Sequence, residues 1–424
     1  MNIKNFVDFI FSIKNFGNKK YKKKIITIFG LKITLSKKNK SSNKINLLYC
    51  PSDNYALSGA FLSMVTLCSL LKDNFNVNPI IILPKKGSGT DLLKKAKIRY
   101  KIIESEDWIL PIGCSFSDII NKIRLSIKNL KAIFKIVKLI YKENIDIVHL
   151  NTVWGYVGGI AAVLTRKPLV WHIRECIKEG QGKDIFIGNI GYKLINMSTN
   201  IIVISNAVLT KYPKLNRNKV KIIYNGINDQ LFYKANHKIL QQPVIKFVCV
   251  GNVQFLKGQQ DLVEACNMLA KNNITNWELN IIGQGKNLEG ITSLIEKYNL
   301  SEKIRVLGKK SDVQNYFAES DISFVPSHFE AFGRVTVEAM LCGCLVIAAN
   351  AGGTPEIIQN AETGIMHEVG NPKDIYDKIV WAMNNREKCI NIANNGRQHA
   401  LSSFIASENA KKISELYKNI LRRE

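Results

Sequence analysis

Short, nearly continuous runs of apolar residues alternate with helix-like segments along the chain from residue 45 onward. Strands that are apolar on both faces are typical of a parallel sheet that helices cover on both sides. The alternation therefore predicts an α/β protein with doubly wound, Rossmann-like sheets. The runs form two series: "INLLYC", "PIIILP", "IDIVHLN", "LVWHIR" and "NIIVIS", then "IKFVCVGN", "WELNIIGQG", "IRVLGKK", "ISFVPS" and "CLVIAAN".

A polar stretch, "NDQLFYKANHKILQQP", separates the two series at 228–243. A chain of 424 residues is also too long for one ordinary domain. We expect an N-terminal domain at 45–230, a linker at 231–243, a C-terminal domain at 244–402 and a final helix at 403–424. Residues 1–44 are expected to form a basic, amphipathic extension with a small hairpin around Gly30. Two doubly wound domains in series predict a ligand-binding cleft at the carboxyl ends of their strands.

The formal net charge is +26, and the charge is unevenly distributed. The first 44 residues contain twelve lysines and a single acidic residue, Asp8. This clustering indicates an anionic partner, either nucleic acid, a phosphorylated small molecule or a membrane surface. A general bias toward Lys, Ile and Asn is an alternative origin of the overall charge, but it does not explain the clustering.

Cysteine content and hydropathy predict the cellular compartment of the protein. The nine cysteines include no C-x-x-C pair, so we expect reduced, mostly buried thiols in a cytosolic protein. No apolar stretch approaches the roughly 18 residues that a membrane-spanning helix needs. The N-terminus does not resemble a signal peptide, because Asp8 interrupts "FVDFIFSI" and no small-residue cleavage site follows.

Two glutamates in "HFEAFGRVTVEAM", Glu330 and Glu338, are eight residues apart. On one helix their side chains would lie about 80° apart and would not share a face. Gly333 instead predicts that Glu330 lies in a loop and that a helix begins near Arg334. Glu338 then lies about one turn into that helix, and the first amides of the helix, near Val335, can bind an anion.

Two further loops of the second series carry candidate ligand-binding groups. "VGNVQFLKG" presents Lys257, a point charge suited to a phosphate, and "AGGTPE" presents Gly352, Gly353 and Glu356. The loops together offer a cation, a helix N-terminus, a glycine pair and three carboxylates. Carboxylates suit neutral hydroxyl groups and not phosphates, so the spacing predicts a nucleotide diphosphate that carries hydroxyl-rich groups. Such a ligand is a nucleotide sugar.

The motif "SHFEAFGRVTVE" resembles the E-x7-E signature of family 4 glycosyltransferases. The order "SGA", "HLN", "WHIRE", "VIS", "YNGI", "VGN", "KG", "GKKSDV", "PSHFEAFG", "AGGTPE" is similar to that family over roughly 45–370. The resemblance implies a GT-B fold with an acceptor-side N-terminal domain and a nucleotide-sugar-binding C-terminal domain. It further implies a retaining, metal-independent hexosyltransferase with no cofactor, whose donor is a UDP-sugar in preference to a GDP-sugar.

The resemblance also implies individual roles in the second domain. Glu338 binds the ribose hydroxyls, Glu330 contacts the donor sugar, and the amides from Gly333 to Val335 hold the diphosphate. Lys257 neutralises the phosphates as the leaving group departs. The alternatives without a ligand role are that Glu338 is a solvent-exposed helix residue and that Lys257 lies in a simple turn.

In the other lobe, Ser58 and Gly59 are implied to approach the diphosphate, and His172 to point at the transferred sugar or the acceptor. The alternative for His172 is a hydrogen-bonded core histidine, and His149 is expected to be structural. Arg174 and Glu175 form a candidate ion pair on the acceptor side.

Family members often have an arginine where this chain has Asn252, so a second phosphate cation is missing unless Lys309 substitutes. The expected catalytic residues are His172, Glu330 and Lys257, and no metal ligand is expected. The expected donor-binding residues are Ser58, Gly59, Asn252, Lys257, Gly308, Lys309, Glu330, Phe332, Gly333, Arg334, Val335, Glu338 and Gly353.

The segment 118–143, "DIINKIRLSIKNLKAIFKIVKLIYKE", predicts an amphipathic helix. Apolar residues at 123, 127, 130, 134, 137 and 141 are each followed by a basic residue, so a cationic stripe lies beside an apolar one. This pattern is typical of a helix at a membrane interface. The alternative is a core-packed helix with a solvated lysine face.

These observations predict a glycosyltransferase at the inner face of a bacterial-type plasma membrane, held there by residues 1–44 and the helix at 118–143. Its acceptor would be a growing, lipid-linked surface glycan. A nucleotide-sugar epimerase is the alternative enzyme, and it needs acid/base residues beyond His172. A basic nucleic-acid-binding protein is the alternative of another class. Nucleic acid is not expected as a partner, because the basic residues lack interleaved aromatic platforms.

Overall fold

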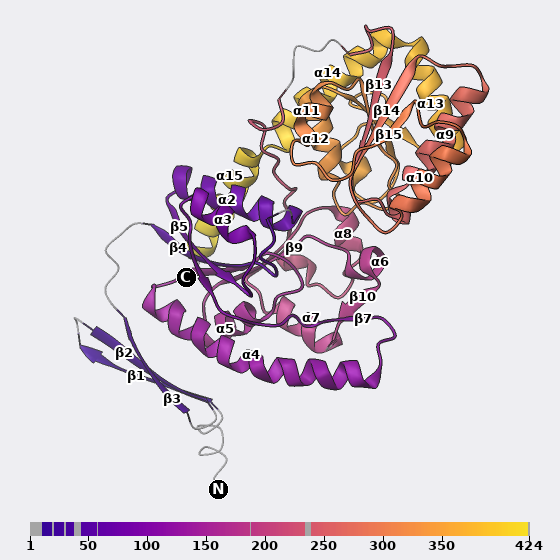
Figure 1. Cartoon of the computed structure of the whole chain (residues 1–424). Coiled ribbons are helices and arrows are strands. Elements are labelled where there is room, and N and C mark those ends of the chain that lie inside the picture. The colour runs from indigo at the N-terminus through magenta and orange to yellow at the C-terminus, as the bar shows by residue number, and fades with distance from the viewer. Residues whose placement is uncertain are drawn as a thin grey trace. The chain divides into compact units, whose positions relative to one another are not determined.

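The computed structural model of the chain describes residues 11–18, 21–28, 31–37, 44–56, 58–186, 188–233 and 239–422, with side chains from residue 44 onward. The chain forms two compact units (Figure 1). Unit 1 comprises Met1–Val203, Lys214–Lys221 and Ala410–Glu424, and unit 2 comprises Ile204–Pro213 and Ile222–Asn409.

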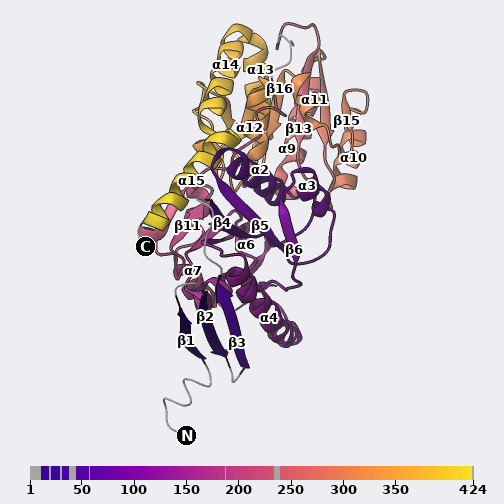
Figure 2. The same cartoon turned by 90° about the vertical axis from the view of Figure 1, so that its left-hand side faces the viewer.

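The described part of the N-terminal extension is a three-stranded antiparallel sheet (Figure 2). Its strands are β1 (Phe11–Asn18), β2 (Tyr21–Ile28) and β3 (Leu31–Lys37). Strands β2 and β3 pair from Ile28 and Leu31 outward, which is where the sequence predicts a hairpin. The apolar and basic side chains to which the sequence assigns a membrane role here lie outside the described residues.

Unit 1 is built on a seven-stranded sheet of order β12-β11-β9-β8-β4-β5-β6, whose neighbours from β11 to β6 run parallel. The sheet strands are β4 (Ile45–Cys50), β5 (Val77–Leu83), β6 (Arg99–Ile102), β8 (Ile147–Leu150), β9 (Leu169–Ile173), β11 (Asn200–Val203) and β12 (Val220–Ile222). The helices are α2 (Gly59–Asn74), α3 (Gly89–Lys95), α4 (Phe116–Lys142), α5 (Val157–Thr165), α6 (Ile177–Gln181) and α7 (Gly188–Asn196). A short antiparallel pair, β7 (Ile109–Pro111) with β10 (Lys183–Ile185), lies outside the main sheet.

Unit 2 is built on a six-stranded sheet of order β15-β14-β13-β16-β17-β18, in which every neighbouring pair is parallel. Its strands are β13 (Ile245–Val250), β14 (Trp277–Ile282), β15 (Ile304–Val306), β16 (Ile322–Val325), β17 (Leu345–Ala349) and β18 (Ile365–His367). Its helices are α8 (Asn206–Thr210), α9 (Gln259–Lys271), α10 (Leu288–Lys297), α11 (Val313–Ala318), α12 (Arg334–Cys342), α13 (Pro372–Asn384) and α14 (Arg386–Ser403), with short 3₁₀ turns η2 (Phe255–Lys257) and η3 (Thr354–Glu356). Phe247, Trp277 and Phe324 are fully buried in its core.

The order of strands reverses once in each sheet. In unit 1 the chain runs from β4 to β5 and β6 on one side and returns to β8, β9 and β11 on the other. In unit 2 it runs from β13 to β14 and β15, then returns to β16, β17 and β18. Doubly wound sheets bind ligands at the carboxyl ends of the strands that flank such a reversal. The two sheets therefore offer ligand-binding positions beside β4/β8 and β13/β16.

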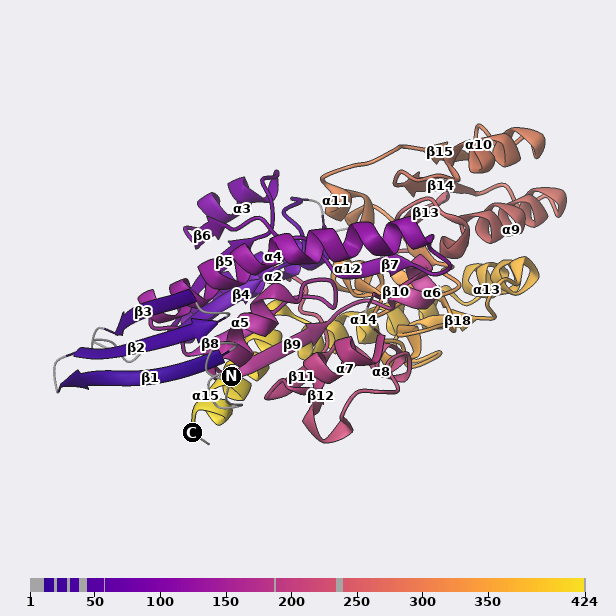
Figure 3. The ribbon, with the colours of Figure 1, turned by 90° about the horizontal axis from the view of Figure 1, so that it is seen from below.

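The C-terminal part of the chain differs from the single helix expected over 403–424. Helix α14 ends at Ser403, and α15 (Ala406–Arg422) follows it after a break at buried Phe404. The residues of α15 from Ala410 onward belong to unit 1. Figure 3 shows the yellow end of α15 near β8, where Tyr417 contacts His149. A helix at the end of the sequence thus completes the core of the first unit.

Candidate functional site

Loops that follow β13 and β16 bring two predicted residues together in unit 2. Lys257 lies in η2 after β13, and Glu330 lies after β16, so the reversal of strand order makes their loops neighbours. Lys257 Nζ lies 2.5 Å from Glu330 Oε1, and Ser327 Oγ donates to the same oxygen over 2.8 Å. Both charged side chains are largely buried. The cation and the loop carboxylate predicted for one ligand are thus partners of each other.

Helix α12 begins at Arg334, directly beside this pair. Its N-cap is Gly333, whose φ of 101° is strained for residues with a Cβ, and no side chain caps the helix. The unsatisfied amides of the first turn carry a partial positive charge and can bind an anion. Phe332 is buried immediately before the N-cap and stacks on Tyr224 with ring centroids 5.8 Å apart.

Glu338 lies one turn into α12, as predicted. It is mostly buried, with 8% of its surface exposed, and Arg334 Nη2 donates to its Oε1 over 3.1 Å. Its carboxylate and that of Glu330 come from a helix and a loop on either side of Gly333, as the spacing of eight predicts. Thr336 is a residue that the sequence did not single out. Its buried hydroxyl has no hydrogen-bond partner among the described residues, and no motif signalled it.

The glycine pair after β17 packs against the backbone of the Glu330 loop. A Cβ on Gly352 would lie 2.1 Å from the carbonyl oxygen of Glu330, and Gly353 N donates to that oxygen over 2.8 Å. A side chain at Gly352 would therefore displace the loop that carries Glu330. The glycines act on Glu330 through close backbone packing, and they hold its loop against the next one.

The prediction that Glu356 is one of three carboxylates available for hydroxyl groups is wrong, because its oxygens already have partners within the protein. Its carboxylate accepts hydrogen bonds from the backbone amides of Asn206 and Ala207, at 2.8 and 2.9 Å, and from the hydroxyl of Tyr224 at 3.2 Å. It thereby caps the start of α8. Since these donors occupy both oxygens, Glu356 is a structural residue, and two carboxylates remain for a ligand.

The remaining predicted donor residues of unit 2 lie on neighbouring loops at the same sheet edge. Gly283 N donates to Gly308 O over 2.8 Å, and a Cβ on Gly283 would lie 1.8 Å from Gly251 O, so the loops after β13, β14 and β15 touch. Asn252 and Lys309 are both exposed on these loops. The structure therefore places Asn252, Gly308 and Lys309 at the edge where Lys257 lies.

Ser58, Gly59 and His172 belong to unit 1. Ser58 is the N-cap of α2, its hydroxyl donates to Asp53 over 2.9 Å, and Gly59 is the exposed first residue of the helix. His172 is fully buried at the carboxyl end of β9, and its Nδ1 lies 3.2 Å from Nε2 of His149. Burial, with the nearby Arg174 guanidinium, holds the pKa of both histidines well below the usual 6.5.

Glu175 follows this histidine on the chain. Its carboxylate accepts from the amides of Arg174, at 3.0 Å, and Val153, at 3.2 Å. Burial raises the pKa of Glu175 from 4.5 to about 7, an effect that these hydrogen bonds and Arg174 partly offset. A carboxyl group with a pKa near 7 can gain or lose a proton at physiological pH.

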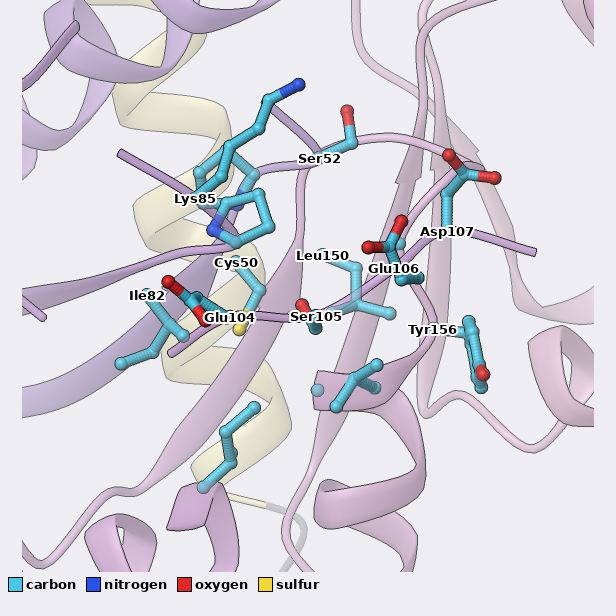
Figure 4. A pocket seen from close by; sticks show the side chains of 16 residues that line it. Cys50, Ser52, Ile82, Lys85, Glu104, Ser105, Glu106, Asp107, Leu150 and Tyr156 are labelled. Atoms are coloured by element: carbon cyan, nitrogen blue, oxygen red, sulfur yellow. The ribbon is translucent and has the colours of Figure 1, made fainter. Parts of the chain in front are cut away.

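A cavity of about 250 Å³ lies at the reversal point of unit 1, between the loops that follow β4, β5, β6 and β8 (Figure 4). Apolar side chains, including Ile82, Leu150 and Tyr156, form part of its wall. The segment 104–107 adds the carboxylates of Glu104, Glu106 and Asp107. Asp107 pairs with Lys122 over 2.9 Å, whereas Glu104 and Glu106 are exposed and have no ion pair among the described side chains.

Three further findings concern the cysteines, possible metal ligands and membrane-spanning helices among the described residues. All nine cysteines are free thiols, and only Cys114 is not buried. Among the side chains that the structure describes, no group of histidine, cysteine, aspartate or glutamate residues could hold a metal ion. In the described part of the chain no helix has the length and apolar character needed to cross a membrane.

Comparison with known proteins agrees with this arrangement. Residues 233–399 match the family model described as "Glycosyl transferases group 1", and residues 116–231 match "Glycosyltransferase Family 4". An uncharacterized glycosyltransferase of Methanocaldococcus jannaschii is 30% identical over 269 residues, which cover 61% of this chain and 72% of the relative. The chain belongs to the group 1, or family 4, glycosyltransferases. The family predicted from the E-x7-E motif is confirmed.

Two further similarities place the glycosyltransferase among known relatives. It is 25% identical over 313 residues to the Escherichia coli "UDP-Gal:alpha-D-GlcNAc-diphosphoundecaprenol alpha-1,3-galactosyltransferase", covering 69% of this chain and 80% of that one. The crystal structure of Anabaena HepE in complex with UDP and glucose has a TM-score of 0.71 and 22% identity, covering 88% of this chain and 99% of the other. The predicted GT-B class, with two Rossmann-like domains, is confirmed.

Proposed function

We propose that this glycosyltransferase moves a hexose from a nucleotide-diphosphate sugar, a UDP-sugar in preference to a GDP-sugar, to a lipid-linked surface glycan. The observation that carries the proposal is the Lys257–Glu330 pair, at 2.5 Å, beside the uncapped start of α12. A nearby anion-binding helix end, a cation and a carboxylate suit a diphosphate joined to a hydroxyl-rich sugar. UDP in the HepE structure and UDP-galactose in the name of the Escherichia coli relative support the choice of base.

Donor binding would exchange partners at this site. The diphosphate accepts hydrogen bonds from the amides of Gly333 to Val335 and competes with Glu330 for the ammonium group of Lys257. The freed carboxylate of Glu330 accepts from hydroxyls of the sugar, and Glu338 accepts from hydroxyls of the ribose. Lys257 therefore gains a stronger anionic partner as charge develops on the leaving diphosphate, which is where preorganised charge lowers a barrier.

The proposed reaction is metal-independent and retains the anomeric configuration. The acceptor hydroxyl oxygen forms a bond to the anomeric carbon on the face from which the diphosphate departs. The bond from that carbon to the diphosphate oxygen breaks, and the departing diphosphate takes the proton of the acceptor hydroxyl. Glu330, the carboxylate assigned to this site, accepts from Ser327 and from the hydroxyls of the sugar once the donor is bound, which disfavours its use as a nucleophile.

The cavity of unit 1 is the proposed site for the sugar end of the acceptor. Its place at the β4/β8 reversal point supports ligand binding. Its glutamates Glu104 and Glu106, which have no ion pair among the described side chains, suit hydroxyl or amino groups and repel phosphate. Changing both to glutamine is expected to slow transfer to a lipid-linked oligosaccharide extract without changing UDP affinity. Unchanged acceptor kinetics would exclude this cavity as the acceptor site.

Membrane contact through α4 is the proposed way to reach a lipid-linked acceptor from the inner face of the plasma membrane. Five large apolar side chains on the first half of α4 are exposed at spacings of four and three residues: Phe116, Ile120, Ile123, Ile127 and Leu130. Six exposed basic residues lie on the same helix: Arg124, Lys128, Lys131, Lys135, Lys138 and Lys142. Asp118 is the only acidic residue within the helix. Apolar insertion next to cationic contact is the pattern of an interfacial helix.

Nucleotide affinity tests the proposed function directly. UDP, GDP and ADP are titrated against the wild type, Glu338→Gln and the control Glu302→Gln, an exposed residue outside these loops. We expect UDP to bind most tightly, and Glu338→Gln to weaken it about tenfold or more, because hydrogen bonds to charged groups contribute about 1.5–3 kcal/mol. Absence of nucleotide binding, together with salt-resistant binding of duplex RNA, would instead establish the nucleic-acid-binding alternative.

A further inference from the structure

One side of α4 holds the acidic segment 104–107 that lines the cavity of unit 1. The side-chain amide of Asn129 bonds to both backbone groups of Glu106: its Oδ1 accepts from the Glu106 amide over 2.8 Å, and its Nδ2 donates to the carbonyl oxygen over 2.9 Å. Two turns earlier on α4, Nζ of Lys122 donates to Oδ1 of Asp107 over 2.9 Å and to the carbonyl oxygen of Asp107 over 3.3 Å. Two side chains of one helix therefore fix the path of this segment.

Asn129 also connects the acidic segment to another part of the cavity wall. Because the backbone of Glu106 offers one donor and one acceptor, it determines which way the Asn129 amide is turned. The second proton of Nδ2 is then donated to the hydroxyl of Tyr156 over 2.8 Å. Tyr156 lines the cavity and stacks on Trp108 with ring centroids 4.9 Å apart. Figure 4 shows Glu106, Asp107 and Tyr156 on the same side of the cavity, so Asn129 joins both parts of one wall.

The residues of α4 that serve the cavity are spaced by seven. Ile136, which lines the cavity, follows Asn129 at the same interval at which Asn129 follows Lys122. Seven residues are close to two turns, so the three side chains share one face of α4, here named the cavity face. At 100° per residue the exposed apolar stripe lies about 140° from this face, and the basic stripe lies about 140° from it in the other direction. The cavity face therefore points away from both stripes that are proposed to meet the membrane.

The first half of α4 is weakly held by the rest of unit 1. Among the described side chains of this helix, none before Asn129 is buried. Segments with few buried apolar contacts change position at a low cost in free energy. A lipid surface that binds the exposed stripes favours the ordered position of this half over others, and such a difference in affinity shifts the population. Since the coupling between two binding events is reciprocal, lipid contact that orders the helix also strengthens binding at the cavity.

We propose that Lys122 and Asn129 are positioning residues for acceptor recognition, and that α4 transmits lipid contact to the acceptor cavity. The two side chains hold Glu106 and Asp107 from the cavity face, while the opposite side of α4 meets the membrane. Lipid contact fixes the segment 104–107, and the acceptor sugar then meets carboxylates that are already in position. The inference rests on the proposed function, because it takes the cavity as the acceptor site and α4 as the lipid contact.

Hydrogen exchange measures the order of the segment without any substrate. Amide exchange over peptides that cover 104–107 is followed in the full-length protein by mass spectrometry, alone, with phosphatidylcholine vesicles, and with vesicles that also contain anionic phosphatidylglycerol. We expect the anionic vesicles to slow exchange of this segment in the wild type about fivefold, as expected when hydrogen bonds of ordinary strength become more persistent. Vesicles of phosphatidylcholine alone should slow it less, because they do not attract the basic stripe.

Two variants remove the proposed link and leave the membrane stripes intact. Asn129→Leu keeps a side chain of similar size and good helix propensity but removes all three hydrogen bonds, and Lys122→Met keeps the length of the side chain without its charge. In both variants the segment should exchange about fivefold faster than in the wild type without vesicles. Anionic vesicles should still protect α4 itself in both variants and should no longer protect the segment.

Transfer kinetics separate positioning from a general loss of structure. With a lipid-linked oligosaccharide extract, both variants should raise the KM for the acceptor about tenfold, while kcat and the KM for the UDP-sugar stay nearly unchanged. Asn121→Leu, at an exposed position of the same helix, is the control and should match the wild type in exchange and in kinetics.

The proposal is overturned if anionic vesicles protect α4 of the wild type without slowing exchange at 104–107. An acceptor KM in Asn129→Leu equal to that of the wild type, or an equal loss of kcat and of donor affinity in that variant, would also overturn it. If the wild type binds no vesicles or turns over no UDP-sugar, the proposed function fails, whereas exchange of the variants without vesicles still decides whether the two residues position the segment.

Discussion

Lys257 is the residue on which the proposed leaving-group chemistry most depends. Asn252 supplies no charge on the same loop, so Lys257→Ala should lower single-turnover transfer by more than tenfold, about 1.4 kcal/mol in the barrier. Donor affinity should fall less, because the amides of α12 still bind the diphosphate. Lys271→Ala, an exposed lysine at the far end of α9, is the control. A loss below tenfold would transfer the role to another cation, with Lys309 the next to test.

For single residues of the candidate site, the sequence motifs predicted which side chains take part but not which side chains they contact. Lys257 and Glu330 were each predicted from a loop motif, yet they are 73 residues apart, and only the order of the strands makes them neighbours. Glu356 shows the opposite case, in which a motif predicted a ligand contact that the folded protein does not allow. Its motif resembles a ligand-binding loop, whereas its actual partners, around Asn206, are 150 residues away and satisfy a helix start. Thr336 carried no signal because its distinguishing property, an unsatisfied buried hydroxyl, exists only in the fold.

Helix α4 supports a prediction about membrane binding. Ile123→Glu with Ile127→Glu places two carboxylates on the exposed apolar stripe, which should abolish flotation with vesicles that contain anionic lipid, because charged groups oppose both insertion and attraction. Thermal stability should remain as in the wild type, since both positions are exposed. Ile190→Glu, an equally exposed site on α7, should float normally. Binding by the wild type should weaken with salt. Undiminished flotation of the double variant would remove α4 from the membrane proposal.

The amphipathic pattern of α4 was predictable, but the division of the helix into two parts was not. The sequence shows one apolar stripe over 123–141, whereas the buried residues of α4 all lie between Asn129 and Ile140. The capping box of Ser115 and Asp118 starts the helix well before the part that packs. Helix length is a local property, and burial depends on where neighbouring α5 lies. The core-packed alternative therefore describes the second half, and the exposed stripe describes the first.

The two-unit organisation was predictable because each sheet has its own series of apolar strands. The strands "INLLYC" and "IKFVCV" coincide with β4 and β13. The exchange of segments between units was not predictable, since residues 204–213 join unit 2 and residues from Ala410 onward return to unit 1. Nothing in the composition of α15 distinguishes its Tyr417 from a surface tyrosine. Its burial against His149 depends on the path of the chain through the whole molecule.

The free energy of unfolding of the whole molecule should depend on pH through Glu175, because burial raises the pKa of this residue from 4.5 to about 7. Below pH 4.5 the carboxyl is protonated in both folded and unfolded chains, and its contribution to stability is fully present. Between pH 4.5 and 7 the unfolded chain has lost this proton while the folded chain retains it, so stability falls as pH rises. Above pH 7 both forms are ionised, and the loss is complete.

Glu175→Gln removes this titration and can keep one of the two backbone hydrogen bonds through its single amide oxygen, because the amides of Val153 and Arg174 donate to different oxygens of the carboxylate. Loss of the other bond lowers stability by an amount that does not depend on pH. The difference in stability, variant minus wild type, should therefore rise between pH 4.5 and 7 and stay level above. The full shift corresponds to on the order of 3 kcal/mol, and we expect roughly half because Glu175 keeps partial contact with solvent. Because the pKa values of His149 and His172 are lowered in the folded protein, these residues decrease its stability as pH falls below 6.5. This contribution is common to both proteins and cancels in the difference. Thermal melting at half-unit steps of pH measures this difference, and Glu179→Gln, at an exposed position of α6, is the control. A difference that stays level across the range, or that falls as pH rises, would mean that Glu175 is ionised in the folded protein near neutral pH and is held by its donors instead.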